Sequence, residues 1–266
     1  MYNTTYHRAS SVADAVAQQA AADEGKYVSG GMTLIATMKQ RLAAPSDLVD
    51  LRHIADLKGI SFNGRMVRIG AATTHFEVAT SAALKAVCPA ICALAGMIGD
   101  PHVRQMGTIG GSVANNDPAA DYPSAVLGLN ARVITNKRTV AADDFFQGLF
   151  ETALEEGEII AAFEFEAPAK AGYSKFPNPA SRYAMAGVFV AKAGDGSVRV
   201  AVTGAGSDGV FRHAGMEQAL SANWNADSVA SQNVDPGDML ADIHGSSEYR
   251  ANLVKVMAKR AVVAAG

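Results

Sequence analysis

Two short glycine motifs with hydroxyl neighbours have the composition of anion-binding loops. They are Ser29-Gly30-Gly31-Met32-Thr33 and Thr108-Ile109-Gly110-Gly111-Ser112. Because consecutive glycines lack Cβ atoms, the backbone N–H groups around them can converge on an oxyanion, and nearby hydroxyls add further donors. The two motifs together therefore predict a site that grips the two phosphates of one diphosphate, although a Gly-Gly pair alone is also typical of a structural turn.

The composition of these motifs favours holding a phosphate group over cleaving it. Neither motif contains Lys or Arg, and the chain has no G-x-x-x-x-G-K-[ST] sequence, so ATP hydrolysis is not expected. A helical pattern begins at Thr33, directly after the first motif. The N-terminus of a helix contributes about half a unit of positive charge, which would favour an anion there.

A third motif, Gly204-Ala205-Gly206-Ser207-Asp208-Gly209, satisfies the G-x-G-x-x-G pattern of nicotinamide-binding domains. That pattern needs a helix that opens at its third glycine. Here Val210-Phe211-Arg212 favours a strand, and a helical pattern starts only near Gly215. The sequence therefore predicts a turn at the end of a strand, with a nicotinamide-dependent reductase as the alternative.

No metal site or metal cluster is expected on this chain. The two cysteines, Cys88 and Cys92, lie four residues apart in an apolar helical pattern, and the six histidines are scattered. A buried helix face explains this cysteine pair better than metal binding does. An iron–sulfur cluster normally requires four thiolates, so two cysteines exclude it.

Length and charge exclude several classes of function. The chain has 266 residues, 49% of them hydrophobic, and a net charge of −3, which indicates a globular protein with no electrostatic signature of nucleic-acid binding. The longest mostly apolar stretch, from Val87 to Ile98, is shorter than the roughly 20 residues that span a bilayer. The N-terminus lacks the apolar region of a secretory signal, so we expect a cytoplasmic protein without a transmembrane segment.

The pattern of elements divides the chain into three segments. In the first, 1–57, Ser10 and Ser11 can cap a helix that runs to about Ala22, and strands are expected at 26–28 and 47–51 around the helix from Thr33. The second, 58–167, opens with a hairpin of strands 59–62 and 66–69 joined by Asn63-Gly64. It continues with helices from Thr74, over 88–98 and over 122–129, a loop over 107–121, and strands at 132–135 and 158–165.

The third segment, 168–266, is rich in strands and then helical. Strands are expected at 172–176, 187–193 and 197–202, the last two joined at Asp195-Gly196. The final helical pattern, 248–264, has an apolar stripe for the core and places Arg250, Lys255 and Arg260 toward water.

The stretches YVSGGMTLIATMKQRLAAPSDLVDLRHI and RQMGTIGGSVANNDPAADYPSAVLGLNARV resemble the two FAD-binding motifs of the medium subunit of molybdenum hydroxylases. This family includes carbon monoxide dehydrogenase and the flavin domain of xanthine dehydrogenase. The similarity extends to GAATTHFEV at 70–78 and EEGEIIAAFEFEAP at 155–168. It implies an α+β fold with a two-part FAD-binding domain similar to that of vanillyl-alcohol oxidase, followed by a small C-terminal α+β domain of sheet and helices.

The resemblance also implies which residues contact FAD. Two runs would wrap the diphosphate through backbone N–H groups, with the Thr33 and Thr108 hydroxyls assisting: Val28, Ser29, Gly30, Gly31, Met32, Thr33 and Leu34, and Gly107, Thr108, Ile109, Gly110, Gly111 and Ser112. Met32 stands where many relatives carry a polar residue.

Further positions match residues near the flavin in the family: Thr74, Ile98, Ile109, Asp121, Ile160 and Lys175. A carboxylate beside a diphosphate would be repelled, so Asp121 is assigned to sugar or ribityl hydroxyls; a helix cap for Tyr122 onward is the simpler structural role and is compatible with that assignment. Ile160 would line the cofactor, and Ile98 and Ile109 would pack against its ring system or else belong to the core. Lys175 would stabilise negative charge near the flavin ring, or else lie on the surface.

By the same resemblance, the chain is the FAD-carrying electron-transfer subunit of a heterotrimeric molybdenum hydroxylase, assembled as a dimer of heterotrimers. A small partner would carry iron–sulfur clusters and a large partner the molybdenum cofactor, with quinone, NAD or oxygen as the electron acceptor. Carbon monoxide is preferred as the substrate over xanthine, aldehydes and N-heterocycles. No side chain here is expected to act as a catalytic acid, base or nucleophile. A free-standing flavin carrier is a further alternative.

Overall fold

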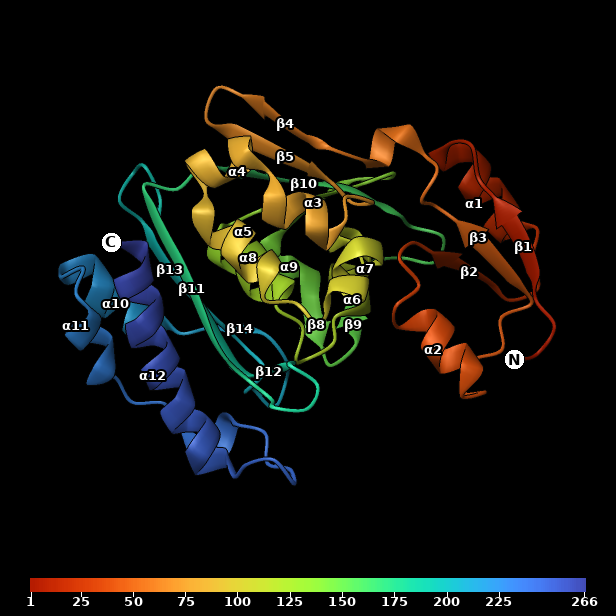
Figure 1. Ribbon diagram of the computed structural model, residues 1–266. Coiled ribbons are helices and arrows are strands. Elements are labelled where there is room, and N and C mark those ends of the chain that lie inside the picture. Colours follow the sequence, from red (N-terminus) through yellow and green to blue (C-terminus); the bar gives the residue numbers. More distant parts are fainter.

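The computed structural model describes residues 1–266, and its first sheet is a small parallel one (Figure 1). Strands β1 (Thr5–Arg8), β3 (Asp47–Asp50) and β2 (Gly25–Val28) lie in that order. Helix α1 (Val12–Ala20), capped by Ser11, and helix α2 (Leu34–Lys39) make the two crossovers that parallel strands require. The predicted elements are confirmed here, and β1 is an additional strand that the sequence pattern did not indicate.

The second sheet has five antiparallel strands in the order β4-β5-β10-β6-β7. These are β4 (Ile60–Asn63), β5 (Met66–Gly70), β10 (Ile160–Glu166), β6 (Arg132–Thr135) and β7 (Thr139–Ala141). The hairpin is confirmed, but Asn63 pairs with Met66 inside the ladder, so the turn is Gly64-Arg65 and only Gly64 (φ +59°) has positive φ. One positive φ at the first turn residue is the signature of a type II′ turn.

Helices pack beneath this sheet (Figure 1). They are α3 (His75–Thr80), α4 (Ala82–Val87), α5 (Pro89–Gly96), α6 (Pro101–Met106), α7 (Ile109–Asn115), α8 (Tyr122–Gly128) and α9 (Ala142–Phe145), with the short strands β8 (Phe146–Gly148) and β9 (Glu151–Thr152). A 3₁₀ turn, Ala55–Leu57, precedes the sheet. Cys88 and Cys92 are buried in this layer, where burial raises the pKa of the Cys88 thiol to about 12.

The third sheet is antiparallel and lies between two helical layers. Its strands are β11 (Lys170–Pro177), β12 (Ala184–Lys192), β13 (Val198–Thr203) and β14 (Phe211–Arg212). Helices α10 (Ala214–Ala222), α11 (Ala226–Ala230) and α12 (Ser247–Ala265) and the 3₁₀ turn Pro236–Asp238 follow. Phe189 and Ala191 of β12 join the core with α5 and α8, whereas Val188 and Val190 join the core with α12, because strand residues alternate between faces.

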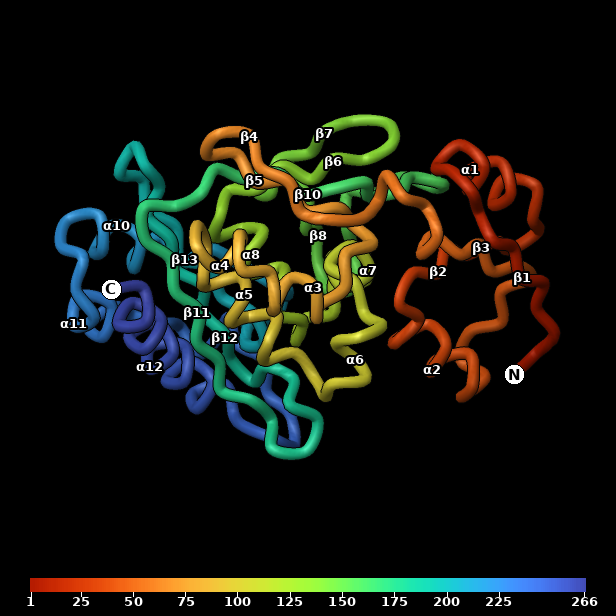
Figure 2. The backbone as a smooth tube through the Cα atoms, turned by 45° about the horizontal axis from the view of Figure 1, so that its top comes forward, coloured from red at the N-terminus to blue at the C-terminus, as the bar shows by residue number.

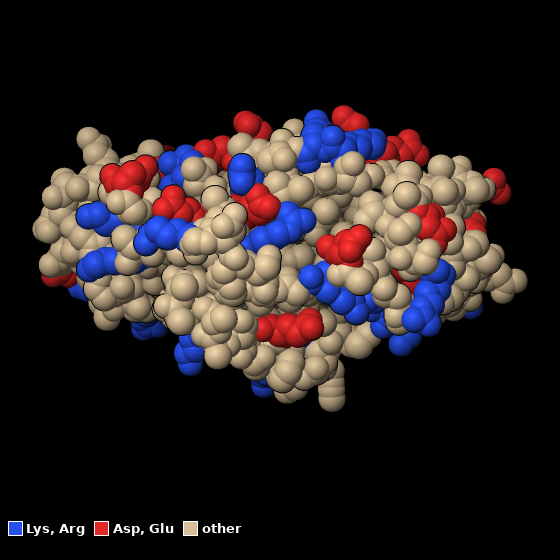
Figure 3. Space-filling model, turned by 90° about the horizontal axis from the view of Figure 1, so that it is seen from above, with Lys and Arg blue, Asp and Glu red and all other residues tan.

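The backbone trace shows the three sheets following one another across the molecule (Figure 2). We propose the divisions 1–57, 58–167 and 168–266 as domains because each of the three main sheets lies within one of them. The last two segments share one hydrophobic cluster. Basic and acidic side chains are interspersed on the face drawn in Figure 3, and none of the helices combines the length and apolar character needed to cross a bilayer.

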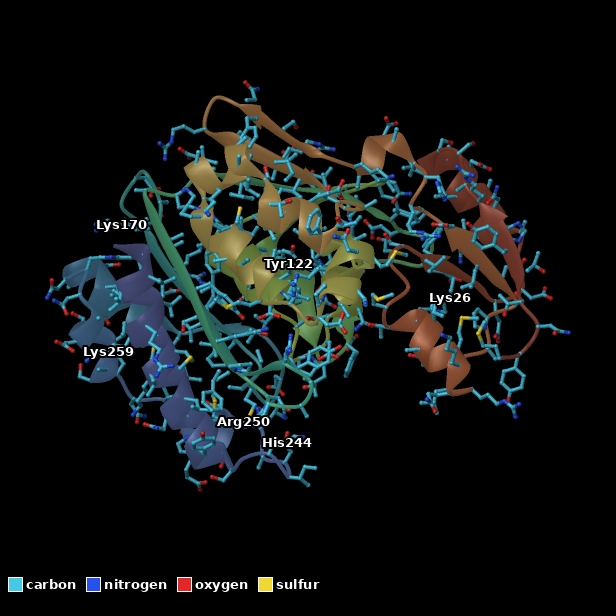
Figure 4. The ribbon with its side chains drawn as sticks, in the orientation of Figure 1. Lys26, Tyr122, Lys170, His244, Arg250 and Lys259 are labelled. Carbon is cyan, nitrogen blue, oxygen red and sulfur yellow. The ribbon has the colours of Figure 1, made fainter.

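The structure corrects two expectations. The predicted loop over 107–121 contains helix α7, which Thr108 caps and Asn116 ends in the left-handed conformation (φ 43°). Two glycines in its first turn hid this helix, because Gly lowers helix propensity. Arg250 does not face water: it is 3% exposed, and its guanidinium donates to the carbonyls of Met185 and Gly204 and to Asp242 (Figure 4).

We expect Arg250→Met to lower the free energy of unfolding by about 2 to 4 kcal/mol, because two buried carbonyls and a carboxylate lose their donor. Urea denaturation checks this. Arg260→Met is the matched control, since Arg260 lies exposed on the same helix, and we expect it to change stability by no more than about 0.5 kcal/mol. Equal effects of the two substitutions would contradict a role for the buried hydrogen bonds.

Candidate functional site

The two Gly-Gly motifs, 79 residues apart in the chain, touch each other. The Thr108 hydroxyl donates to the Ser29 hydroxyl at 3.0 Å. A Cβ built on Gly30 would lie 2.2 Å from the carbonyl oxygen of Met106 and 2.6 Å from the Cα of Gly107. Since no side chain fits in that space, Gly30 is the residue that lets the two backbones meet.

A cavity of about 550 Å³ opens at this junction. Fifteen of the predicted residues line it: Val28, Ser29, Gly30, Gly31, Met32, Thr33, Leu34, Ile98, Gly107, Thr108, Gly110, Gly111, Ser112, Asp121 and Ile160. Three do not. Thr74 caps α3, Ile109 is buried in the core beneath the second motif, and Lys175 lies behind Asp121.

The first motif supplies unpaired backbone donors. The backbone N–H groups of Ser29, Gly30, Gly31, Met32 and Thr33 donate no hydrogen bond within the chain. Gly31 has φ +71°, a conformation that glycine adopts without strain, and it turns the chain from the end of β2 into α2. Five successive free N–H groups along a cavity wall are the donors that the predicted anion-binding loop would need.

The second motif is built differently from the prediction. The N–H of Ile109 donates to Thr73 O, that of Gly110 to Ala71 O at 2.8 Å, and those of Gly111 and Ser112 to Thr108. These bonds hold α7 against the end of β5, where a Cβ on Gly110 would lie 2.6 Å from that of Ala71. This motif therefore offers hydroxyl groups and close approach to a ligand, whereas most of its backbone N–H groups are already occupied.

His75 packs against Gly107, the residue directly before the second motif. The backbone N–H of His75 donates to Gly107 O, and a Cβ on Gly107 would lie 2.5 Å from His75 Nε2. The ring also lines the cavity and is buried, with its Nδ1 lacking a hydrogen-bond partner in the chain. Burial, together with the positive charge of Arg104, lowers the pKa of His75 to about 4, so this imidazole is neutral at pH 7.

Asp121 and Lys175 form a buried ion pair at 3.0 Å, with side chains only 5% and 3% exposed. The Tyr173 hydroxyl donates to the same carboxylate. Burial raises the pKa of Asp121, while Lys175 and Tyr173 act in the opposite direction. Asp121 occupies the N-cap position of α8, but its side chain makes no capping hydrogen bond. The alternative of a surface position for Lys175 is wrong, because its side chain is buried.

Other cavity residues escaped the sequence prediction: Lys26, Tyr27, His75, Asp117, Glu158 and Tyr183 are among them. Strand alternation could have indicated Lys26, because it lies two residues before Val28 on β2. Nothing local indicates Tyr183, whose loop between β11 and β12 reaches the cavity only through the tertiary fold. No cluster of three or more His, Cys, Asp or Glu side chains is arranged to hold a metal ion.

The site fits a flavin dinucleotide. Free N–H groups and hydroxyls suit a diphosphate, apolar residues such as Ile98 and Ile160 suit flat rings, and the volume lies within the usual range of about 300 to 1,000 Å³ for cofactor sites. The missing side chains of Gly30 and Gly110 let the protein's own backbone segments meet, and at Gly111 a Cβ would meet only Thr108 Oγ1, so the backbone there is open to close approach.

Comparisons with known proteins agree with this geometry. Residues 2–167 match the family described as the FAD binding domain in molybdopterin dehydrogenase. The chain is 31% identical to the carbon monoxide dehydrogenase medium chain of Hydrogenophaga pseudoflava and 32% identical to the nicotine 6-hydroxylase medium subunit of Paenarthrobacter nicotinovorans; each alignment covers 98% of this chain and 96% of the relative.

A solved structure of reconstituted carbon monoxide dehydrogenase from Oligotropha carboxidovorans has a chain with the same fold. The TM-score is 0.90 at 33% identity, and the match covers 99% of this chain and 97% of the other. The mixed α/β architecture matches that of the solved chain, in agreement with the sequence comparisons. The matched domain is an FAD-binding one, so FAD is the cofactor of this chain. The protein therefore belongs to the family of FAD-binding subunits of molybdenum hydroxylases.

Proposed function

We propose that this protein is the electron-transfer subunit of a heterotrimeric molybdenum hydroxylase. The observation that carries the proposal is the junction of the two Gly-Gly motifs at a cavity suited to FAD. FAD, when bound, accepts single electrons and releases pairs, which suits a subunit between a one-electron donor and a two-electron acceptor. With two buried cysteines and no metal-binding cluster, this chain would receive its electrons from clusters on a partner.

The chain's own residues would bind and orient the cofactor and perform no acid or base step on the organic substrate. We assign the diphosphate to the N–H groups of 29–33 and to the Thr108 hydroxyl, and the flavin end to the region of Ile98 and Ile160. Asp121 would accept hydroxyl donors from the cofactor, with its charge balanced by Lys175. Thr74, Ile109 and Lys175 would not contact the cofactor but would hold the residues that line the cavity.

The proposal includes partners and a fold comparison. Residues 1–167 would form a two-part domain like that of vanillyl-alcohol oxidase. The names of the relatives, which are medium chains or subunits, support a small iron–sulfur partner and a large molybdenum partner, assembled as a dimer of heterotrimers. Quinone, NAD or oxygen would take the electrons.

Carbon monoxide is the substrate we propose for the complex, because two carbon monoxide dehydrogenases are among the similar proteins. The nicotine 6-hydroxylase subunit is equally similar, so a hydroxylase of N-heterocycles is the second candidate. The similarity to subunits of such different enzymes supports a substrate choice made on the large subunit.

A nicotinamide-dependent reductase is disfavoured by the geometry at Gly204–Gly209. The chain leaves this turn into β14, and α10 begins only at Ala214. A Cβ on Gly204 would lie 2.3 Å from Ala184 O, and one on Gly206 would lie 2.5 Å from Gly209 O. These glycines permit internal packing and present no helix N-terminus to a dinucleotide.

Purification of the chain from its native source tests the proposed function. We expect a coloured complex that contains an iron–sulfur subunit and a molybdenum subunit, and a flavin spectrum from this chain once it is separated from them. Activity of that complex on carbon monoxide or on N-heterocycles identifies its substrate. A colourless chain that takes up no FAD would refute the proposal, and a flavoprotein without partners would favour a free-standing flavin carrier.

We expect Gly111→Leu to weaken FAD binding strongly with only a small change in stability. Gly111 lines the cavity, and a Cβ there would meet only Thr108 Oγ1, at 3.1 Å, so we expect a longer side chain to occupy part of the cavity. Replacing a helical glycine adds up to about 1 kcal/mol of helix propensity. Fluorescence titration with FAD and urea denaturation check the two effects. Gly96→Leu is the control, because a Cβ on Gly96 meets nothing within 4 Å and Gly96 does not line the cavity; retained FAD binding in the Gly111 variant would contradict the site.

We expect acid to lower the free energy of unfolding of the FAD-free chain through protonation of His75. The unfolded imidazole binds a proton near pH 6.5, whereas the pKa of folded His75 is about 4. The stabilisation from a neutral His75 is therefore complete above pH 6.5 and is lost as the pH falls toward 4, up to about 3 kcal/mol. His75→Gln should remove this part of the pH dependence in urea denaturation; an identical pH profile for both proteins would count against it.

A further inference from the structure

The cavity wall carries more negative charge than positive. Three carboxylates line it, and two of them are balanced: Asp121 pairs with Lys175 and Glu158 with Arg138 at 3.1 Å. Asp117 forms no ion pair; it accepts a hydrogen bond from the N–H of Ala119. His75 contributes no positive charge while it is neutral. A dinucleotide diphosphate would add two further negative charges, and free N–H groups can donate to them but carry no net positive charge.

Lys26 is the one lysine or arginine that lines the cavity. Lys26, which is labelled in Figure 4, lies on β2 in the N-terminal segment, three residues before Ser29. Its ammonium has no carboxylate within 4.0 Å and donates no hydrogen bond in the chain, whereas Lys175 and Arg138 are both committed to ion pairs. Strand alternation puts Lys26 on the same face of β2 as Val28, which also lines the cavity.

We propose that the Lys26 ammonium is the counter-ion of the FAD diphosphate. The inference rests on the proposed function and deepens it, because neither Gly-Gly motif contains a basic residue. In this arrangement the N–H groups of 29–33 orient the phosphate oxygens and Lys26 supplies the net positive charge. A lysine suits this role because its ammonium is a compact point charge on a flexible stem that can adapt to the bound phosphate.

The experiment compares FAD with riboflavin, which lacks the diphosphate and the adenosine, in the flavin-free full-length chain. Dissociation constants are measured by fluorescence titration for the wild type, Lys26→Met, Lys26→Arg and Lys39→Met; ADP is titrated as a competitor. Lys39 is the control, because it is exposed in the same unit, as Lys26 is, but does not line the cavity.

We expect Lys26→Met to weaken FAD and ADP binding about ten- to hundred-fold, the value of a hydrogen bond to a charged group, and to leave riboflavin binding unchanged. Lys26→Arg should restore most of the affinity, and Lys39→Met should behave as the wild type. Raising the salt concentration should weaken FAD binding more in the wild type than in Lys26→Met.

Two results would overturn the proposal for Lys26: unchanged FAD affinity in Lys26→Met, or an equal loss of affinity for FAD and riboflavin. Both leave the proposed function intact as long as the wild type binds FAD. Failure of the wild type itself to bind FAD would instead refute the proposed function.

Discussion

The contact of Gly30 with the backbone of Met106 and Gly107 is the constraint on which the site depends. It brings the end of strand β2 and the start of helix α7 to van der Waals distance, so that the N–H groups of the first motif and the hydroxyls of the second lie at one cavity. Any side chain at Gly30 would separate the two motifs. The hydrogen bond between Thr108 and Ser29 adds direction to this contact, but the missing Cβ is what makes it possible.

Much of the fold and of the site is predictable because it is encoded in local patterns. The hairpin at Gly64, the caps at Ser11 and Thr74 and the two Gly-Gly motifs depend on residues close together in sequence. Fifteen of the eighteen predicted site residues line the cavity for the same reason: most of them lie within the two motifs.

The remaining features depend on tertiary contacts. Arg250 looks like a surface residue in its helical pattern, yet the carbonyls of Met185 and Gly204 that bind it come from distant strands. Lys175 looks like a surface lysine until the fold brings Asp121 beside it. Helix α7 is held by bonds to Thr73 and Ala71 in spite of its glycines, so tertiary structure there overrides weak propensity.

The small size of the N-terminal core has a mechanical consequence. The two buried clusters that contain residues of that unit have 8 and 3 members, and two of the eight, Ala72 and Ile159, belong to the next segment; the clusters elsewhere have 32 and 20. A unit with so little buried apolar surface opens locally at low free energy. A ligand in the cavity would contact both this unit and α7, so the bound cofactor would stabilise the contact between the N-terminal unit and the rest of the protein. Loss of the cofactor would then make local unfolding of the N-terminal unit easier than unfolding elsewhere.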